Sequence, residues 1–122
     1  MKSIKPNKVK IPRPPSIGEE LLAIHLKEAK IDFVRQFRFH PTRLWKADFS
    51  LRGINGDILI EIEGGVFMKK GGHTTGKSYS ENCIKYNHAA LMGFVVLRFT
   101  TGQVQSGEAI NFIKQYLKER KI

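Results

Sequence analysis

The stretch from Asp57 to Gly65 constrains the fold more than any other part of the sequence. It reads Asp-Ile-Leu-Ile-Glu-Ile-Glu-Gly-Gly. Residues two apart in a β-strand point to the same side, so the three isoleucines would share one face while Glu61 and Glu63 share the other. Two carboxylates about 7 Å apart along a strand repel each other unless a cation lies beside them. Two interpretations follow: a solvated edge strand, or a site for a divalent metal ion.

A second strand in front of this stretch favours the metal site. Residues 45–51 alternate apolar and polar side chains, with Asp48 on the polar side. Asn55-Gly56 is a strong turn signal, so the two strands are expected to form an antiparallel hairpin. Counting outward from the turn places Asp48 close to Glu61. Both acids then leave the sheet from the face opposite the aliphatic side chains, which argues against a solvated edge.

The other periodicities predict an α/β (α+β) fold in the order αβββαβα, with a central mixed sheet of about four strands flanked by helices. A helix is expected from Ser16 or Gly18, because Ser16 and Glu19 match a capping box. Glu19 also falls on the inward stripe of this helix, so it is either a cap or a side chain that points into a site. The remaining predicted elements are a strand at 34–39, a helix at 79–92 ended by Gly93, a buried strand at 94–99 and a helix at 110–118.

Charge indicates the class of partner. The chain has a net charge of +10 on 122 residues, which favours nucleic acid over a membrane. Half of this charge lies in residues 1–17, a proline-rich segment that is expected to be a flexible arm following phosphates ahead of a single domain at 18–122. No apolar run approaches a transmembrane length and no apolar segment follows the N-terminal lysines, so a cytoplasmic protein is expected.

The single cysteine excludes an intrachain disulfide and a cysteine-based zinc site, and Cys83 is expected at a buried helix position. Residues 71–78 match the phosphate-binding pattern G-x-x-x-x-G-K-[ST]. That motif needs a buried strand directly before it and an acid at the end of a later strand, and the sequence offers neither. We interpret the glycine-rich segment 64–77 instead as a loop over a nucleic-acid backbone. The candidate nucleic-acid contacts are Arg43, Lys69, Lys70, His73 and Lys77, whereas His25, His40 and His88 are interpreted as packed or exposed.

A longer series of motifs adds to this interpretation. They are Arg35 to Phe39, Pro41-Thr42-Arg43, Trp45-x-x-Asp48-Phe49, Glu61-x-Glu63-Gly64-Gly65, Gly72-His73-Thr74-x-Gly76, Lys85-Tyr86-Asn87 and Leu97-Arg98-Phe99. Together they resemble the small phage and prophage endonuclease-like proteins of the PD-(D/E)XK nuclease superfamily, over about residues 19–104. The resemblance implies a restriction-endonuclease-like fold and hydrolysis of DNA phosphodiesters with Mg²⁺ or Mn²⁺.

The same resemblance implies roles for individual residues. Asp48, Glu61 and Glu63 would ligate the metal, Glu19 would be the supporting helix acid, and Lys85 would act on the phosphate. The sequence departs from the family pattern at Glu63, which stands where a lysine is usual; Lys85 or Lys77 could supply that charge. Asn82 stands where an acid is expected.

Three functions remain open from the sequence. The first is a metal-dependent endodeoxyribonuclease, a phosphodiester hydrolase. The second is a nucleic-acid-binding module on a nuclease-like fold without catalysis. The third is a junction-resolving or mismatch-nicking enzyme, which would act on branched DNA as a homodimer.

Overall fold

The computed structural model describes residues 16–51, 57–64 and 76–120. The elements follow in the order α1 (Ile17–Glu28), β1 (Phe33–Arg38), β2 (Lys46–Leu51), β3 (Ile58–Glu63), α2 (Gly76–Leu91), β4 (Val95–Thr100), α3 (Thr101–Gln105) and α4 (Glu108–Arg120). The predicted mixed fold is confirmed, with the short helix α3 as an addition to the expected order. Residues 1–15 of the predicted arm, the Asn55-Gly56 turn and the loop residues Lys69, Lys70 and His73 lie outside the described residues, whereas Ser16 and Ile17 belong to the start of α1.

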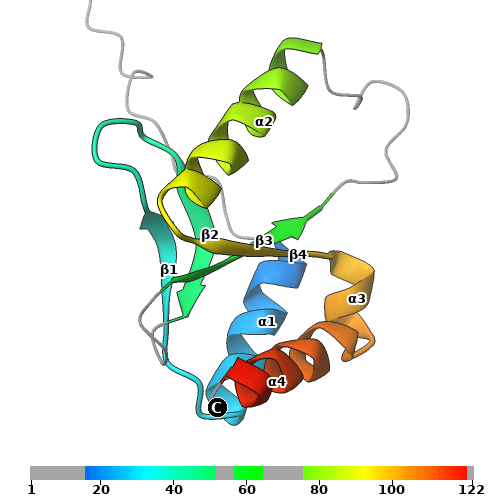
Figure 1. Ribbon diagram of the computed structural model, residues 1–122. Helices are drawn as coiled ribbons and strands as arrows, with labels where there is room; N and C mark the ends of the chain where they lie inside the picture. The colour runs from blue at the N-terminus through cyan, green and yellow to red at the C-terminus, as the bar shows by residue number, and fades with distance from the viewer. Residues whose placement is uncertain (1–15, 52–56, 65–75, 121–122) are drawn as a thin grey trace, which may run out of the picture.

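The four strands form one mixed sheet in the order β1-β2-β3-β4 (Figure 1). The pairs β1–β2 and β2–β3 are antiparallel, and β3–β4 is parallel. Strand β3 therefore has a neighbour on each side, and its first three residues are at most 1% exposed. The interpretation of this strand as a solvated edge is excluded.

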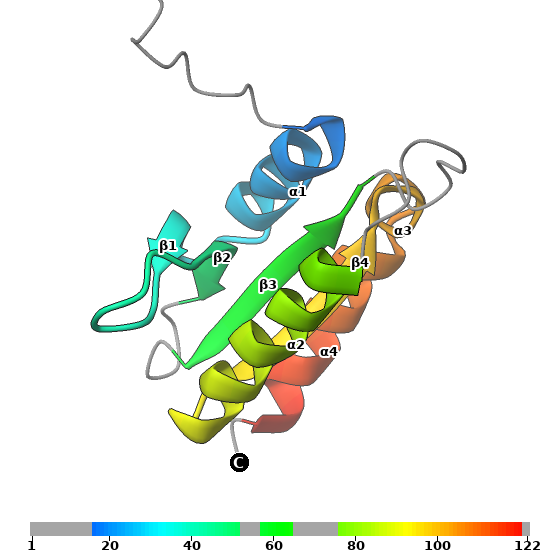
Figure 2. The same ribbon diagram turned by 90° about the horizontal axis from the view of Figure 1, so that it is seen from above.

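Helices cover both faces of the sheet (Figures 1 and 2). On one face, α1, α3 and α4 pack over the larger core, and on the other face α2 packs over a smaller one. The larger core contains Leu22, Leu26, Phe49, Leu51, Ile58, Ile60, Val104 and Ile113. The smaller core contains Phe39, Ala47, Leu59 and Ala89. Residues of β3 thus alternate between two cores, as expected for a strand buried on both faces.

The inward face of α2 differs from the prediction. Cys83 is exposed, Leu91 is 80% exposed, and the residue that packs into the smaller core is Ala89. Lys85 and Tyr86 are partly buried on the same side of the helix. The spacing of apolar residues does not identify the inward face of α2, because the strand surface under the middle of this helix carries the Glu61 carboxylate. A lysine can pair with this buried carboxylate, and an aliphatic side chain cannot.

The ends of two helices follow from their sequences. Ser16 caps α1 by accepting a hydrogen bond from the backbone N–H of Glu19 at 3.1 Å. Gly93 follows α2 with a φ of 93°, in the left-handed region that glycine adopts without strain, and the predicted C-terminal cap is confirmed. Among the helices of the described segments, none has both the length and the apolar character needed to cross a membrane.

Candidate active site

Two carboxylates lie where β2 and β3 separate. The last residue pair of the β2–β3 ladder is Phe49 with Ile60, and one further step would set Asp48 opposite Glu61. Asp48 Oδ2 instead accepts a hydrogen bond of 2.8 Å from the backbone N–H of Ile62. The carboxylate therefore occupies the position of a ladder acceptor and is held beside Glu61, as the count along the hairpin predicts.

Lys85 of α2 supplies the nearest positive charge. Its Nζ lies 3.1 Å from Glu61 Oε2, and the side chains of the two residues are only 14% and 12% exposed. Burial raises the pKa of Glu61 to about 7, with Lys85 opposing the shift and Asp48 adding to it. Burial also raises the pKa of Asp48, against the hydrogen bond from Ile62. One lysine does not offset the desolvation of both carboxylates, so a further cation would stabilise their charged forms.

Glu19 reaches this cluster through Gln36. Its carboxylate does not complete a reciprocal cap but accepts hydrogen bonds from Arg35 Nη2 at 3.2 Å and Gln36 Nε2 at 3.0 Å. Gln36 Nε2 also lies 3.5 Å from Asp48 Oδ1. Gln36 has a φ of 51°, unusual for a residue other than glycine, and it lies between the β1–β2 pairs that flank Asp48. A strained backbone thus places one amide between two acids.

Sequence reasoning did not identify Gln36 or Arg35 as part of the site. The signal that could have found Gln36 is the strand register, because a hairpin of β1 with β2 sets residue 36 opposite residue 48. Arg35 also bridges to Glu20 at 2.8 Å, an exposed contact that lowers the pKa of Glu20 chiefly through the Arg35 hydrogen bond.

Glu63 takes part in a neighbouring ion pair. Arg98 of β4 donates from Nε to Glu63 Oε2 at 2.8 Å, and its guanidinium lies 4.5 Å from the ring centre of Tyr86. Burial, reinforced by the negative charge of Glu61, raises the pKa of Tyr86 to about 12. In the three described segments no group of three or more His, Cys, Asp and Glu side chains is arranged to hold a metal ion. Of the three expected metal ligands, Asp48 and Glu61 thus lie side by side, whereas Glu63 is paired with Arg98.

The predicted nucleic-acid contacts are only partly placed. Arg43 lies between β1 and β2, with its guanidinium 4.4 Å from the ring centre of Trp45. Lys77 lies in the first turn of α2, but its side chain is outside what the structure describes. Asn82 is exposed on α2. His40 and His88 pack against each other with ring centres 5.1 Å apart, in agreement with their interpretation as packed side chains.

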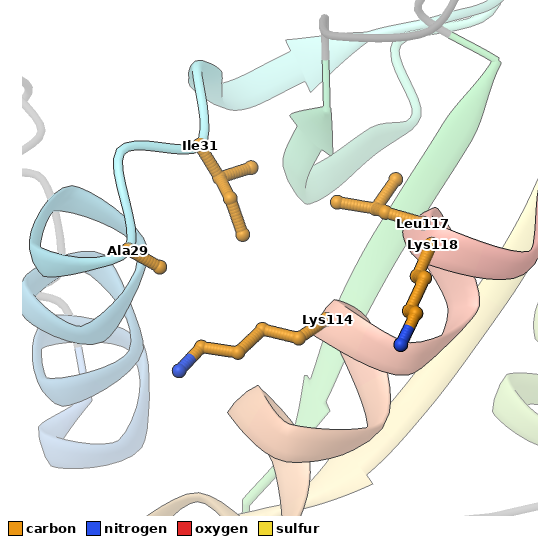
Figure 3. A pocket seen from close by; sticks show the side chains of 5 residues that line it. All are labelled: Ala29, Ile31, Lys114, Leu117 and Lys118. Carbon is orange, nitrogen blue, oxygen red and sulfur yellow. The ribbon is translucent and has the colours of Figure 1, made fainter. Parts of the chain in front are cut away.

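A hollow of about 410 Å³ lies on the other side of the sheet (Figure 3). Ile31 and Leu117 point into it, and Lys114 and Lys118 lie at its rim. It is bordered by the end of α1 and by α4, whereas the acids pair with Lys85 on α2. The hollow is therefore separate from the carboxylate cluster.

Comparison with known proteins gives a structural neighbour. No protein family model and no curated protein sequence matches the chain. Among solved structures, the chain is similar to the catalytic domain of the homing endonuclease I-Bth0305I, with a TM-score of 0.62 and 16% sequence identity. The match covers 88% of this chain and 100% of that one. At this identity the likeness shows a shared fold.

Proposed function

We propose that the chain is a divalent-metal-dependent endodeoxyribonuclease that hydrolyses phosphodiester bonds. The observation that carries the proposal is the side-by-side burial of Asp48 and Glu61, each with a raised pKa, in a chain of net charge +10. Buried carboxylates with shifted pKa values are typical of functional sites. The shared fold with a homing endonuclease catalytic domain supports the same assignment.

The residues present suit Mg²⁺ or Mn²⁺. Mg²⁺ is commonly bound through one or two carboxylates together with waters and substrate phosphate oxygens, and Asp48 with Glu61 offers such a set. A bound ion would activate a water molecule and offset charge on the phosphoryl oxygens. Glu63 would join the shell only on release from Arg98, whose Nε it accepts at 2.8 Å.

The protein side chains have separate proposed tasks. Asp48 and Glu61 hold the cation, and Glu19 orients Asp48 through the Gln36 amide. The Lys85 ammonium group would leave Glu61 and pair with the substrate phosphate. It would then take the role of the lysine that usually stands at position 63. Its 3.1 Å contact with Glu61 supports this role, because the nitrogen already lies at the edge of the cluster.

Cleavage assays on conservative variants test the proposal. Asp48→Asn and Glu61→Gln are each expected to reduce Mg²⁺-dependent cleavage of plasmid DNA by on the order of 10²-fold or more, since each removes a negative oxygen ligand. The matched controls are Asp32→Asn and Glu28→Gln, the same chemical changes at exposed positions outside the cluster. Circular dichroism verifies that all four variants fold.

Wild-type protein that cuts no duplex, single-stranded or branched DNA with either metal would overturn the proposal. DNA binding that persists in EDTA would then support the alternative of a non-catalytic binding module, which the Glu63–Arg98 pair at the usual lysine position favours. Preference for a four-way junction over linear duplex would instead support a junction-resolving enzyme, for which a dimer is required.

A further inference from the structure

The turn between β1 and β2 is organised by its own side chains. His40 Nδ1 accepts hydrogen bonds from the backbone N–H groups of Thr42 at 3.2 Å and Arg43 at 3.0 Å. Burial, His88 and Arg43 all lower the pKa of His40, which favours the neutral ring that can accept these bonds. The rings of Phe39 and Trp45 stack at the base of the turn, with centres 6.2 Å apart. The backbone between these rings is therefore held in one conformation.

Helix α2 braces the same turn. The His88 ring centre lies 5.1 Å from that of His40 and 5.3 Å from that of Trp45. His88 is three residues after Lys85 on the same helix, so the turn is tied to the element that completes the carboxylate cluster. On the outside of the turn, the Arg43 guanidinium covers the Trp45 ring at 4.4 Å.

One large apolar side chain is left outside this packing. Leu44 is 73% exposed, although its neighbour Arg43 covers the Trp45 ring and its other neighbour, Trp45, stacks on Phe39. Its surroundings are basic, since Arg38, Arg43 and Lys46 are exposed and the sequence from 33 to 47 contains no acid. Some DNA-binding proteins insert an apolar side chain between two base pairs while nearby cations contact the phosphates. This turn, which exposes a leucine between cations, has the same arrangement.

We infer that Leu44 is a wedge that enters the base stack of bound DNA and distorts the duplex, with Arg38, Arg43 and Lys46 on the flanking phosphates. The inference rests on the proposed function in taking DNA as the partner. Leu44 lies two residues before β2 and four residues before Asp48, a separation of roughly 13 Å if the chain between them is extended. Since base pairs are 3.4 Å apart, the distorted step would lie about four base pairs from the scissile phosphate.

A binding experiment without cleavage tests the wedge. A duplex of about 25 base pairs with a fluorophore at each end reports bending through energy transfer, and its anisotropy reports affinity. In an Asp48→Asn background without metal, adding Leu44→Ala is expected to weaken binding about tenfold and to remove the change in energy transfer. The matched control is Leu91→Ala, the same truncation at a leucine that is 80% exposed on α2.

The possible outcomes separate the wedge from the nuclease proposal. Affinity within about twofold of the background protein, an unchanged bend, or an equal loss in Leu91→Ala would each overturn the wedge, while cleavage by the wild type would still support the hydrolase. Conversely, bending that depends on Leu44 in a protein that never cleaves would support the wedge and overturn the hydrolase.

Discussion

At the scale of single residues, the Glu61–Lys85 pair determines how the site behaves without metal. Glu61 Oε2 and Lys85 Nζ are 3.1 Å apart and nearly buried, yet the pKa of Glu61 is raised to about 7, so desolvation outweighs the attraction. The protein therefore carries a carboxylate that is costly to ionise. Such a carboxylate fits the role of metal ligand that we propose for Glu61.

This pair makes stability depend on pH. The pKa of Glu61 rises from its ordinary value of 4.5 to about 7 on folding, so the folded state holds an extra proton between those values. The free energy of unfolding should then fall as pH rises from about 4.5 to 7 and stay low above 7. Glu61→Gln should be more stable than wild type by about 1–3 kcal/mol at pH 8 in EDTA, and about equal to it at pH 4.

Urea denaturation at both pH values measures this difference. Glu28→Gln, a change at an exposed glutamate, is the control and should follow the wild type at each pH. Asp48 keeps a slope of the same sign in Glu61→Gln because its pKa is raised as well. A variant that is less stable than wild type at pH 8 would contradict the assignment of desolvation as the dominant effect.

The acids could be predicted from sequence, but their partners could not. Asp48 and Glu61 were found because strand alternation and turn position together fix which residues meet across a hairpin. The position of the Gln36 side chain depends on a backbone with positive φ. Glutamine has no preference for this conformation, so the sequence does not predict it. Arg98 meets Glu63 across the parallel β3–β4 pair, and the register of such a pair is not set by a turn.

At the scale of elements, the N-terminal turn of α1 is packed closely against the end of the sheet. A Cβ atom on Gly18 would lie 2.9 Å from Thr101 Oγ1 and 3.1 Å from Ile62 Cγ2. This close approach brings Glu19, the next residue, over β1 and within reach of Gln36. Glycine is therefore needed at position 18 for packing.

Substitution of this glycine should reverse the usual preference for alanine in helices. Gly18→Ala is expected to destabilise the protein by about 1–3 kcal/mol, because the added methyl group overpacks the contact. Gly102→Ala in α3 is the matched control: its nearest contact would be an ordinary 3.8 Å, so it should gain up to about 1 kcal/mol. Thermal denaturation of both variants measures the contrast, and equal stabilisation of the two would show that α1 tolerates displacement.

Sequence patterns predicted the elements better than their orientation. Helix α3 escaped prediction although Thr100 and Gln103 form a capping box, because five residues do not show a hydrophobic period. The prediction that Cys83 is buried on this helix was wrong, and the apolar residues Ile84 and Leu91 of α2 are likewise 43% and 80% exposed. The side of a helix that meets a polar site cannot be found from apolar spacing alone.

At the scale of the whole molecule, charge is distributed unevenly along the chain. Five of the lysines and arginines lie in residues 1–17, where the sequence has no acid. Nonspecific affinity for DNA should therefore depend strongly on this segment and on salt. The carboxylate cluster contributes an opposing charge on the folded part, which a metal ion would neutralise.

Neutralising the N-terminal cations should change the salt dependence of binding. With the five cations of residues 1–17 replaced by glutamine, the slope of log affinity against log salt should become shallower by up to about 4.5, since each phosphate contact contributes about 0.9. Anisotropy titrations at several salt concentrations measure the slope. The control replaces four exposed lysines of the folded part, Lys27, Lys30, Lys114 and Lys118, with glutamine. An equal loss of slope per removed charge in this control would mean that the N-terminal segment has no special role.

The mixed pairing of the sheet also determines the order in which the site is assembled. Asp48 and Glu61 belong to neighbouring strands of a hairpin, a contact that is local in sequence and forms quickly. Lys85 arrives only when the crossover through α2 places β4 beside β3, a non-local and slower step. During synthesis the two carboxylates are therefore expected to meet before Lys85 is placed, and the Glu61–Lys85 ion pair is expected to form only with the last strand.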